Sequence, residues 1–170
     1  MINVEIIPCS QEYLEKLIEG ADAFKKAYGV SVVDGYLPLE FRGILQHSQS
    51  QMQSGQIWHP WVCYLFLLRS ERVFVGLGGF KSVPDDNRTV EIGYSVAPSY
   101  QNKGVATSAV KQLIEIAIAS NAVDCVCAHT LAEPNASTKV LQKCGMTKVA
   151  ESIDPEDGAV WKWEYTLGVR

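Results

Sequence analysis

The sequence predicts a mixed α/β fold in which a twisted mixed sheet is flanked by helices. Between residues 61 and 97 three β-rich runs are joined by turns, and the third of them alternates between apolar and small or charged residues. After Pro98 the period changes to about 3.6, and helical and strand-like runs then alternate to residue 167. Hairpin-linked strands followed by a β-α-β-α-β series are typical of a mixed α/β protein. The order differs from the regular alternation of a Rossmann domain.

The N-terminal part of the chain is predicted to form one short strand followed by two helices. Residues 3–7 are a β-like run. Apolar side chains then recur at helical spacing over residues 11–27, and Ser10 stands where an N-cap residue is expected. Turn residues interrupt this pattern at 29–35, and a second, weaker helical pattern covers residues 39–52.

Three strands in series are predicted for residues 61–69, 73–80 and 89–97. The first two are joined by Ser70 and Glu71, which is typical of a hairpin. Side chains of a strand alternate between its two faces, so the third strand has one apolar face and one face of small or charged residues. The apolar face carries Val90, Ile92, Tyr94 and Val96, and the other face carries Glu91, Gly93 and Ser95.

The rest of the chain is predicted to form two helices and three strands. The helices cover residues 106–121 and 135–144, and the strands cover residues 124–130, 147–151 and 160–167. Gly145 follows the second helix at C′, the position where a left-handed glycine ends many helices. The chain has 170 residues, a length that fits one hydrophobic core, so we expect residues 1–170 to form a single domain.

Composition and charge argue against two kinds of partner. The net charge of −4 is unlike that of a nucleic-acid binder, which carries a basic face. The longest apolar run, residues 61–68, is too short to span a membrane, and residues 1–8 carry no secretory signal pattern. We therefore expect neither a nucleic acid nor a membrane as a partner.

The cysteines indicate a reducing compartment. There are five of them, an odd number without regular spacing, which is a poor disulfide framework. Cys125 and Cys127 are separated by one residue rather than two, so they match neither a redox pair nor half of a zinc site. We expect buried free thiols, a cytoplasmic protein and no bound metal.

A short motif between the third strand and the following helix is the first sign of a ligand site. The start of a helix has unpaired backbone N–H groups and the positive end of the helix dipole, so it can hold a pyrophosphate. Gly104 and Ala106 are small enough for the backbone to approach phosphate oxygens, and Asn102 tolerates a left-handed turn. The alternative is an ordinary strand-to-helix turn. The motif is neither a Walker loop nor GxGxxG.

Three segments together resemble the GNAT acetyltransferase family. Gln101-x-x-Gly104-x-Ala106 is similar to the family's acetyl-CoA loop, Gln/Arg-x-x-Gly-x-Gly/Ala. Residues 91–94, Glu-Ile-Gly-Tyr, resemble a strand of the branch that includes the ribosomal-protein N-terminal acetyltransferases. Residues 135–146 resemble that branch's Asn-x-Ser helix, with Met146 in place of the commoner aromatic residue. The segments follow the family's order and spacing over roughly residues 60–150. Asn102 stands where many members have a second glycine.

The resemblance implies a GNAT fold whose sheet opens between two parallel strands to admit acetyl-CoA. The backbone amides of the loop would cradle the pyrophosphate, and these belong to Gln101, Asn102, Lys103, Gly104, Val105 and Ala106. Val96 would pair its backbone with the pantetheine arm. Asn135 would hydrogen-bond the same arm, and Ser137 would lie near the sulfur. From the residues alone, Asn135 is also a good N-cap, and Ser137 can satisfy an N–H group in the first helical turn.

Glu91 is the leading candidate for a general base, because the resemblance places it beside the opening of the sheet. The alternative is an ordinary surface carboxylate on a solvated face. His129 is the next residue able to take this role, although a structural histidine is the commoner case. Lys139 and Lys143 are four residues apart and can face either an anionic cofactor or solvent. Cys144 is expected to pack against the sheet.

The reaction expected from these features is acetyl transfer from acetyl-CoA to a primary amine. The acceptor would be a protein N-terminal α-amine or a small-molecule amine. One alternative is a non-catalytic acyl-CoA-binding or regulatory domain, and another is a nucleotide-binding module that prefers ATP or NAD. The apolar strand at residues 160–167 could pair across a homodimer.

Overall fold

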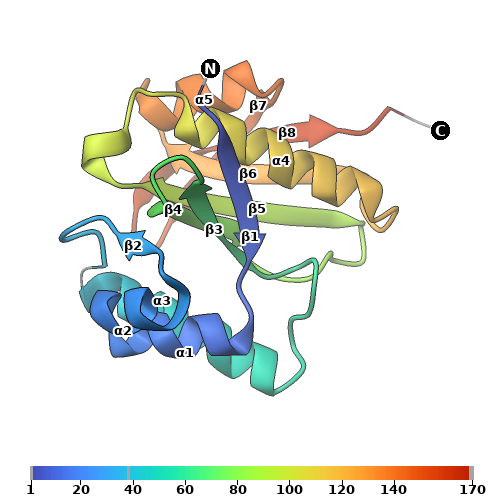
Figure 1. Ribbon diagram of the computed structural model, residues 1–170. Coiled ribbons are helices and arrows are strands. Elements are labelled where there is room, and N and C mark those ends of the chain that lie inside the picture. Colours follow the sequence, from blue (N-terminus) through green and yellow to red (C-terminus); the bar gives the residue numbers. More distant parts are fainter. Residues whose placement is uncertain (1, 38, 169–170) are drawn as a thin grey trace.

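The computed structural model describes residues 2–37 and 39–168, and only the backbone of residues 39–41. Its sheet has the strand order β1-β3-β4-β5-β6-β8-β7, with β2 paired to β4 (Figure 1). The elements are β1 (Val4–Pro8), α1 (Gln11–Glu19), α2 (Ala21–Tyr28), β2 (Ser31–Val32), α3 (Leu39–Gln53), β3 (Cys63–Leu68), β4 (Val73–Phe80), β5 (Thr89–Val96), the 3-10 helix η1 (Pro98–Tyr100), α4 (Val105–Ala119), β6 (Cys125–Leu131), α5 (Ala136–Lys143), β7 (Thr147–Asp154) and β8 (Gly158–Thr166). The predicted mixed α/β fold is confirmed.

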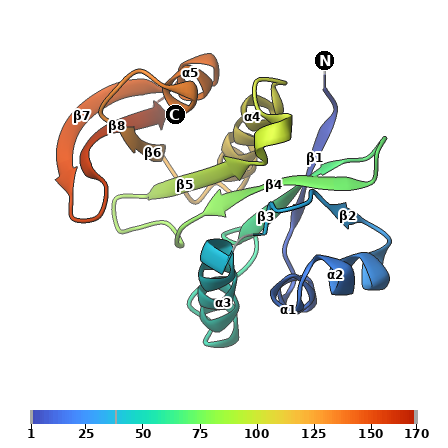
Figure 2. The same ribbon diagram turned by 90° about the vertical axis from the view of Figure 1, so that its left-hand side faces the viewer.

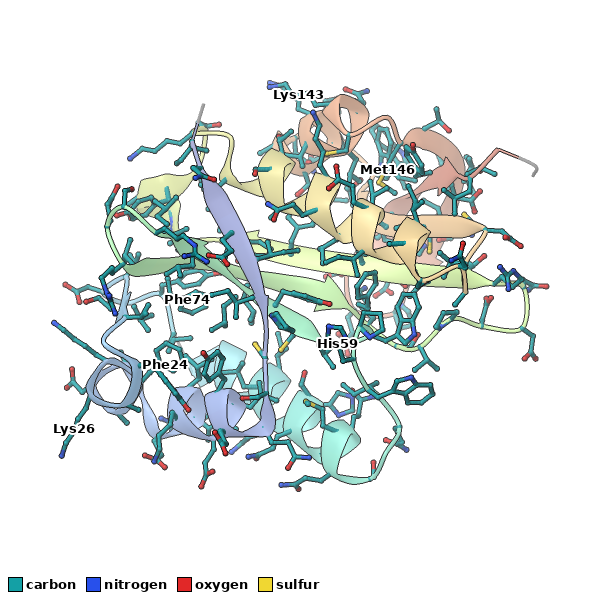
Figure 3. The ribbon with its side chains drawn as sticks, turned by 45° about the vertical axis from the view of Figure 1, so that its right-hand side comes forward. Phe24, Lys26, His59, Phe74, Lys143 and Met146 are labelled. Atoms are coloured by element: carbon teal, nitrogen blue, oxygen red, sulfur yellow. The ribbon has the colours of Figure 1, made fainter. Side chains whose placement is uncertain are left out.

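Helices cover both faces of the sheet (Figure 2). α4 packs on one face, where Phe66 and Val75 of the sheet meet Leu113 of the helix in one buried cluster. α1, α2 and α3 pack on the opposite face of the N-terminal half. There Phe74 and Phe24 belong to a second buried cluster between the sheet and these helices (Figure 3). The large apolar side chains thus hold three layers together.

The N-terminal helical region differs from the prediction. Residues 11–27 were expected to form one helix, but Gly20 adopts φ 129° and ψ 171°, which ends α1 and starts α2. Only glycine adopts such angles readily. The Ser10 cap is confirmed, since its Oγ accepts a hydrogen bond from the N–H of Tyr13 at 3.1 Å. The predicted turn at 29–35 also contains β2, a short strand that the sequence analysis missed.

Glycines in β4 let a large side chain cross the strand. A Cβ added at Gly76 would lie 2.5 Å from the Phe66 ring, and one added at Gly78 would lie 2.7 Å from the same ring. Phe66 is fully buried and comes from the neighbouring strand β3. Larger residues at these two positions would therefore displace a core side chain.

The sheet opens between its two central parallel strands. β5 and β6 pair from Thr89 to Glu91 on one side and from Cys125 to Cys127 on the other. Beyond this point β5 continues to Val96 beside β4, and β6 continues beside β8, but their pairing with each other ends. The opening lies at the C-terminal end of β5, directly before η1 and α4.

The C-terminal strands correct one expectation. β8 lies between β6 and β7 and pairs with both. Its backbone is therefore already hydrogen-bonded on both sides, so this strand cannot pair across a dimer as predicted. Among the described residues, no helix is long and apolar enough to cross a membrane.

Candidate active site

The loop before α4 has the conformation that its residues suggested. Asn102 has φ 59° and Gly104 has φ 85°, both in the left-handed region, and Gly104 is the N-cap of α4. The prediction that Asn102 adopts a left-handed turn is confirmed. The nearest group to a Cβ added at Gly104 would be a methyl of Ile2, at 3.7 Å. This 15-residue helix, whose first N–H groups have no partner within the helix, thus starts where the sheet opens.

A cavity of about 370 Å³, here called the cofactor cavity, lies between this loop, the end of β5 and the helices α4 and α5. Six predicted loop and strand residues line it: Val96, Gln101, Asn102, Gly104, Val105 and Ala106. Ser137 lines it from α5. The side chain of Lys103 instead lies over the Tyr100 ring, with Nζ 4.9 Å from the ring centroid.

Two lysines give the cofactor cavity a cationic wall. Lys139 and Lys143 both line it from α5, and Figure 3 shows Lys143 on that helix. Of the two alternatives, facing a cofactor or facing only solvent, the geometry supports the first. Two ammonium groups and a helix N-terminus around one cavity favour an anionic ligand such as a diphosphate.

The backbone of Val96 is turned toward the opening of the sheet. The N–H of Ala97 donates to Val75 O at 2.8 Å, and the N–H of Lys81 donates to Glu91 O at 2.9 Å. In an antiparallel ladder such pairs alternate with residues whose N–H and C=O point the other way. Val96 is one of those residues, and its carbonyl accepts a hydrogen bond from Nε2 of Gln101 at 3.1 Å. An extended amide-bearing arm could pair with this strand edge.

A second cavity, here called the Glu91 cavity, brings together the predicted chemical groups. It measures about 530 Å³, and Glu91, His129, Asn135 and Ser137 are among its lining residues. Ser137 also lines the cofactor cavity, so the two cavities meet at this residue. Four positions spread over 47 residues of sequence thus converge on one side of the opening.

Glu91 is held in an ion-pair network. Its Oε1 lies 2.5 Å from Nζ of Lys81 and 3.0 Å from Nδ1 of His129. Burial raises the pKa of Glu91, but the hydrogen bonds and charges of Lys81 and His129 outweigh burial, so its pKa lies below the ordinary 4.5. The carboxylate is therefore ionised at neutral pH. Its negative charge favours the His129 tautomer that donates from Nδ1, which leaves the lone pair on Nε2.

Asn135 caps α5, as its position in the sequence suggested. Its Oδ1 accepts a hydrogen bond from the N–H of Thr138 at 2.9 Å, and Thr138 Oγ1 accepts one from the N–H of Asn135 at 3.0 Å. This capping box fixes the start of the helix that carries Ser137 and the two lysines. The contact of Asn135 with a pantetheine arm stays a prediction.

Removing this cap is expected to lower stability. Asn135→Ala deletes the acceptor for the Thr138 N–H, so the free energy of unfolding should fall by about 1 kcal/mol. Urea denaturation followed by circular dichroism measures this change. Gln142→Ala, at an exposed position of the same helix, is the control and should change stability by less than about 0.5 kcal/mol. Equal effects of the two variants would contradict the capping role.

The sequence analysis missed two residues of this region. Tyr94 was assigned to the apolar face, but its hydroxyl donates to Ser137 O at 3.4 Å and it lines the cofactor cavity. Burial raises the pKa of Tyr94 to about 12, so the hydroxyl keeps its proton. Lys81 follows β4 directly, and a single lysine after a strand gives no signal of a partner ten residues further on.

A third cavity, here called the α3 pocket, lies between α3 and the floor made by β4 and β5. It measures about 450 Å³. It shares Tyr94 and Ser95 with the cofactor cavity and Lys81 with the Glu91 cavity. Below it the hydroxyl of Tyr36 donates to Ser95 O at 2.8 Å, which ties the segment before α3 to the opened strand.

Two further side chains near these cavities have structural roles. Trp61 is buried and packs edge-on against Phe80, with ring centroids 4.9 Å apart. Cys144 belongs to the buried cluster between the sheet and α4, its Sγ lies 3.6 Å from Thr107 O, and burial raises the pKa of its thiol. Within the described ranges, no cluster of His, Cys, Asp and Glu side chains could hold a metal.

An opened sheet beside a cationic, glycine-bearing helix start defines a protein that holds a phosphate-bearing cofactor with an extended arm. Comparison with known proteins identifies its family. A family model described as the acetyltransferase (GNAT) domain matches residues 31–147, which is more than half of the chain. The chain therefore belongs to the GNAT acetyltransferase family.

Individual relatives agree with this assignment. The uncharacterized N-acetyltransferase YjdG of Bacillus subtilis (strain 168) is 29% identical over 82 residues, which are 48% of this chain and 49% of YjdG. The match thus spans about half the length of that curated relative.

Two solved structures show the same fold. A ribosomal-protein α-N-acetyltransferase, RimL, in complex with coenzyme A superposes with a TM-score of 0.71 and 16% identity, over 98% of this chain and 97% of RimL. A microcin self-immunity acetyltransferase, MccE, in complex with acetyl-CoA and AMP superposes with a TM-score of 0.69 and 15% identity, over 98% of this chain and 94% of MccE. At these identities the likeness shows the fold alone.

Proposed function

We propose that this protein transfers the acetyl group of acetyl-CoA to a primary amine. The observation that carries the proposal is the meeting of the cofactor cavity and the Glu91 cavity at Ser137, where the sheet opens. A donor bound in the first cavity would present its thioester to groups in the second. The likeness to RimL supports an N-terminal α-amine as the acceptor, and a small-molecule amine is the alternative.

The cofactor cavity would bind acetyl-CoA through its backbone and its lysines. The backbone N–H groups of residues 102–106, which include those of Lys103 and Val105, would face the diphosphate, as helix starts do in other phosphate sites. The N–H of Gln101 already donates to Pro98 O at 3.3 Å, so Gln101 would contribute its side chain rather than its backbone N–H. Val96 would then pair with the pantetheine arm. For this, the carboxamide of Gln101 must share or release the Val96 carbonyl that it now contacts at 3.1 Å. Asn135 would contact the arm from the other side of the opening.

Glu91 and His129 would remove the proton from the acceptor. An alkyl ammonium cannot attack a thioester until it loses a proton, and a positioned base supplies this step. The lowered pKa of Glu91 makes its carboxylate a weak base by itself. Because Glu91 Oε1 orients Nδ1 of His129 at 3.0 Å, the pair would act as one unit, with Nε2 or a bound water accepting the proton.

Groups on the other side of the thioester would assist the leaving thiolate. Ser137 lies where the two cavities meet, and its hydroxyl could donate to the departing sulfur. Tyr94 keeps its proton and lies against the same residue. By the same alternation that exposes Val96, the N–H of Tyr94 faces the opening and could stabilise the oxyanion of the tetrahedral intermediate.

Titration calorimetry with acetyl-CoA, followed by thiol release in the presence of amines, tests the proposal. We expect acetyl-CoA to bind and coenzyme A to be released only when an acceptor amine is present. Binding without release for any amine would favour the non-catalytic acyl-CoA-binding alternative. Preference for ATP or NAD over acetyl-CoA would favour a nucleotide-binding module and would contradict the cofactor assignment.

The proposal extends to the setting of the protein. All five cysteines are free thiols, which supports a reducing compartment such as the cytoplasm. β1 and the C-terminal strands belong to the same sheet, which supports one domain over residues 1–170. A homodimer would need a surface other than β8, and the β7 edge is the nearest candidate.

A further inference from the structure

The α3 pocket points to the chemical class of the acceptor. We infer that the acceptor carries an uncharged, largely apolar substituent beside its primary amine, and that polyamines and other polycations are poor substrates. This inference rests on the proposed acetyl transfer and adds the substrate class. It follows from where the pocket lies and from which side chains line it.

The pocket lies where an acceptor must arrive. It shares Tyr94 and Ser95 with the cofactor cavity, so a group that fills it touches the strand beside the cofactor arm. It shares Lys81 with the Glu91 cavity, so the same group ends near the Glu91–His129 pair. Its volume of about 450 Å³ is within the range of small-ligand sites.

The walls of the pocket are mostly apolar. Ile44, Ile57 and Leu77 provide its large apolar groups. Glycines form much of the floor, and the Lys81 stem lies over one of them, since a Cβ added at Gly93 would lie 3.3 Å from Lys81 Cε. Aliphatic and aromatic walls favour an apolar substituent by about 25 cal/mol for each Å² that it buries.

The described polar groups that line the pocket carry no negative charge. His47, Ser48 and Gln51 face it from α3, and in the part of the chain whose side chains are described no Asp or Glu lines it. A second ammonium bound there would lose hydration without gaining a carboxylate partner. It would also approach Lys81, whose Nζ already binds Glu91 at 2.5 Å. A polycation is therefore disfavoured, whereas a neutral side chain is not.

Three carboxylates line the neighbouring Glu91 cavity. Those of Glu91 and Asp154 are already engaged, and that of Asp157 is exposed to solvent. Glu91 is bound by Lys81 and His129. Asp154 accepts hydrogen bonds from the N–H groups of Glu156 at 2.8 Å and Asp157 at 3.0 Å. These contacts hold the pKa of Asp154 below its ordinary value, as do the nearby charges of Lys81 and His129. The reacting amine would face this cavity, and the uncharged substituent would fill the α3 pocket.

A matched pair of acceptors tests the inference. Leucinamide and lysinamide present the same α-amine but differ in the charge of the side chain. We expect kcat/KM for leucinamide to exceed that for lysinamide by roughly 10-fold or more, because a buried charge left unpaired is strongly disfavoured. Pentapeptides that begin with Leu or Lys form a second arm. A higher kcat/KM for leucinamide than for the Leu peptide would identify a small free amine as the acceptor. A higher kcat/KM for the Leu peptide would identify a peptide N-terminus.

Two variants of α3 locate the effect. Gln51→Glu keeps the shape of the side chain and adds a carboxylate to the pocket, so the Leu-to-Lys ratio should fall by roughly 10-fold. Gln53→Glu adds the same charge at an exposed position of the same helix, outside the pocket lining. That control should leave the ratio unchanged.

The possible outcomes separate this inference from the proposed function. Wild-type protein that acetylates lysinamide or spermidine as well as leucinamide would overturn the inference and leave acetyl transfer standing. The same shift in ratio for both glutamate variants would also overturn it, because the effect would then come from the overall charge of α3. Tight acetyl-CoA binding with no thiol release from any of these amines or peptides would instead contradict the proposed function.

Discussion

Glu91→Gln is expected to lower kcat by roughly 10²- to 10⁴-fold while acetyl-CoA affinity is retained, because the variant keeps the shape of the side chain and loses its charge. His129→Ala is expected to cause a loss in the same range. If the two residues act as one unit, the double variant should lose no more than the worse single variant. Steady-state thiol-release kinetics and calorimetry measure the two quantities separately.

A matched control separates this effect from a general loss of charge. Glu164→Gln removes a carboxylate of β8 that pairs with Lys162 at 2.8 Å, outside the Glu91 cavity. It should retain normal turnover. Independent, multiplicative losses for Glu91→Gln and His129→Ala would rule out the paired mechanism. If His129→Ala alone is impaired, Glu91 has only a structural role.

The lowered pKa of Glu91 also fixes the direction of a pH effect. Because its pKa in the folded state lies below 4.5, the ion pairs of Glu91 stabilise the fold at neutral pH and are lost only as the pH falls through that lowered pKa. An acidic limb of the pH–rate profile at higher pH must therefore come from another group, such as the acceptor amine.

Gly104→Val is expected to reduce acetyl-CoA affinity by roughly 10- to 100-fold, the equivalent of losing one hydrogen bond to a charged group. The added side chain would stand at the mouth of the cradle and keep the backbone from the diphosphate. The fold should persist, because the nearest group to an added Cβ is 3.7 Å away. Because the valine would be held at φ 85°, in the left-handed region, the free energy of unfolding should fall by about 1–2 kcal/mol.

The control for Gly104→Val is a second glycine that also has a left-handed φ but lies elsewhere in the chain. Gly55 has φ 72° and nothing within 4 Å of an added Cβ, and it does not line the cofactor cavity. Gly55→Val should lose a similar amount of stability and bind acetyl-CoA normally. Unchanged affinity in a folded Gly104→Val protein would remove the phosphate cradle from the mechanism.

Local patterns predicted much of this molecule. The β-rich run over residues 73–80 matches β4 at both ends. Gly145 has φ 82° after α5, as its C′ position indicated. The same holds for the left-handed Asn102 and for the Asn135 cap. Each of these depends on side-chain periodicity or on the backbone preference of one residue, which neighbouring residues in the chain suffice to define.

Local sequence patterns did not predict the contacts between distant segments. Gly20 reads as a tolerated glycine in a helical pattern, and only the packing of α1 and α2 as separate helices shows the break. Tyr94 alternates onto the apolar face, but the opening of the sheet brings it against Ser137, 43 residues away. The position of β8 inside the sheet likewise depends on strand order.

Apart from β2 and the break between α1 and α2, the sequence by itself determined the order of the elements, together with the phosphate-type loop and the family resemblance that the comparisons confirmed. Tertiary structure decided that Glu91 meets Lys81 and His129, which lie on separate strands or loops, and that a pocket without described carboxylates lies under α3. The reason is physical: the pKa of Glu91 and the polarity of a pocket depend on which charges and walls approach through space. Pairing between strands far apart in the chain sets those approaches, and no local pattern encodes them.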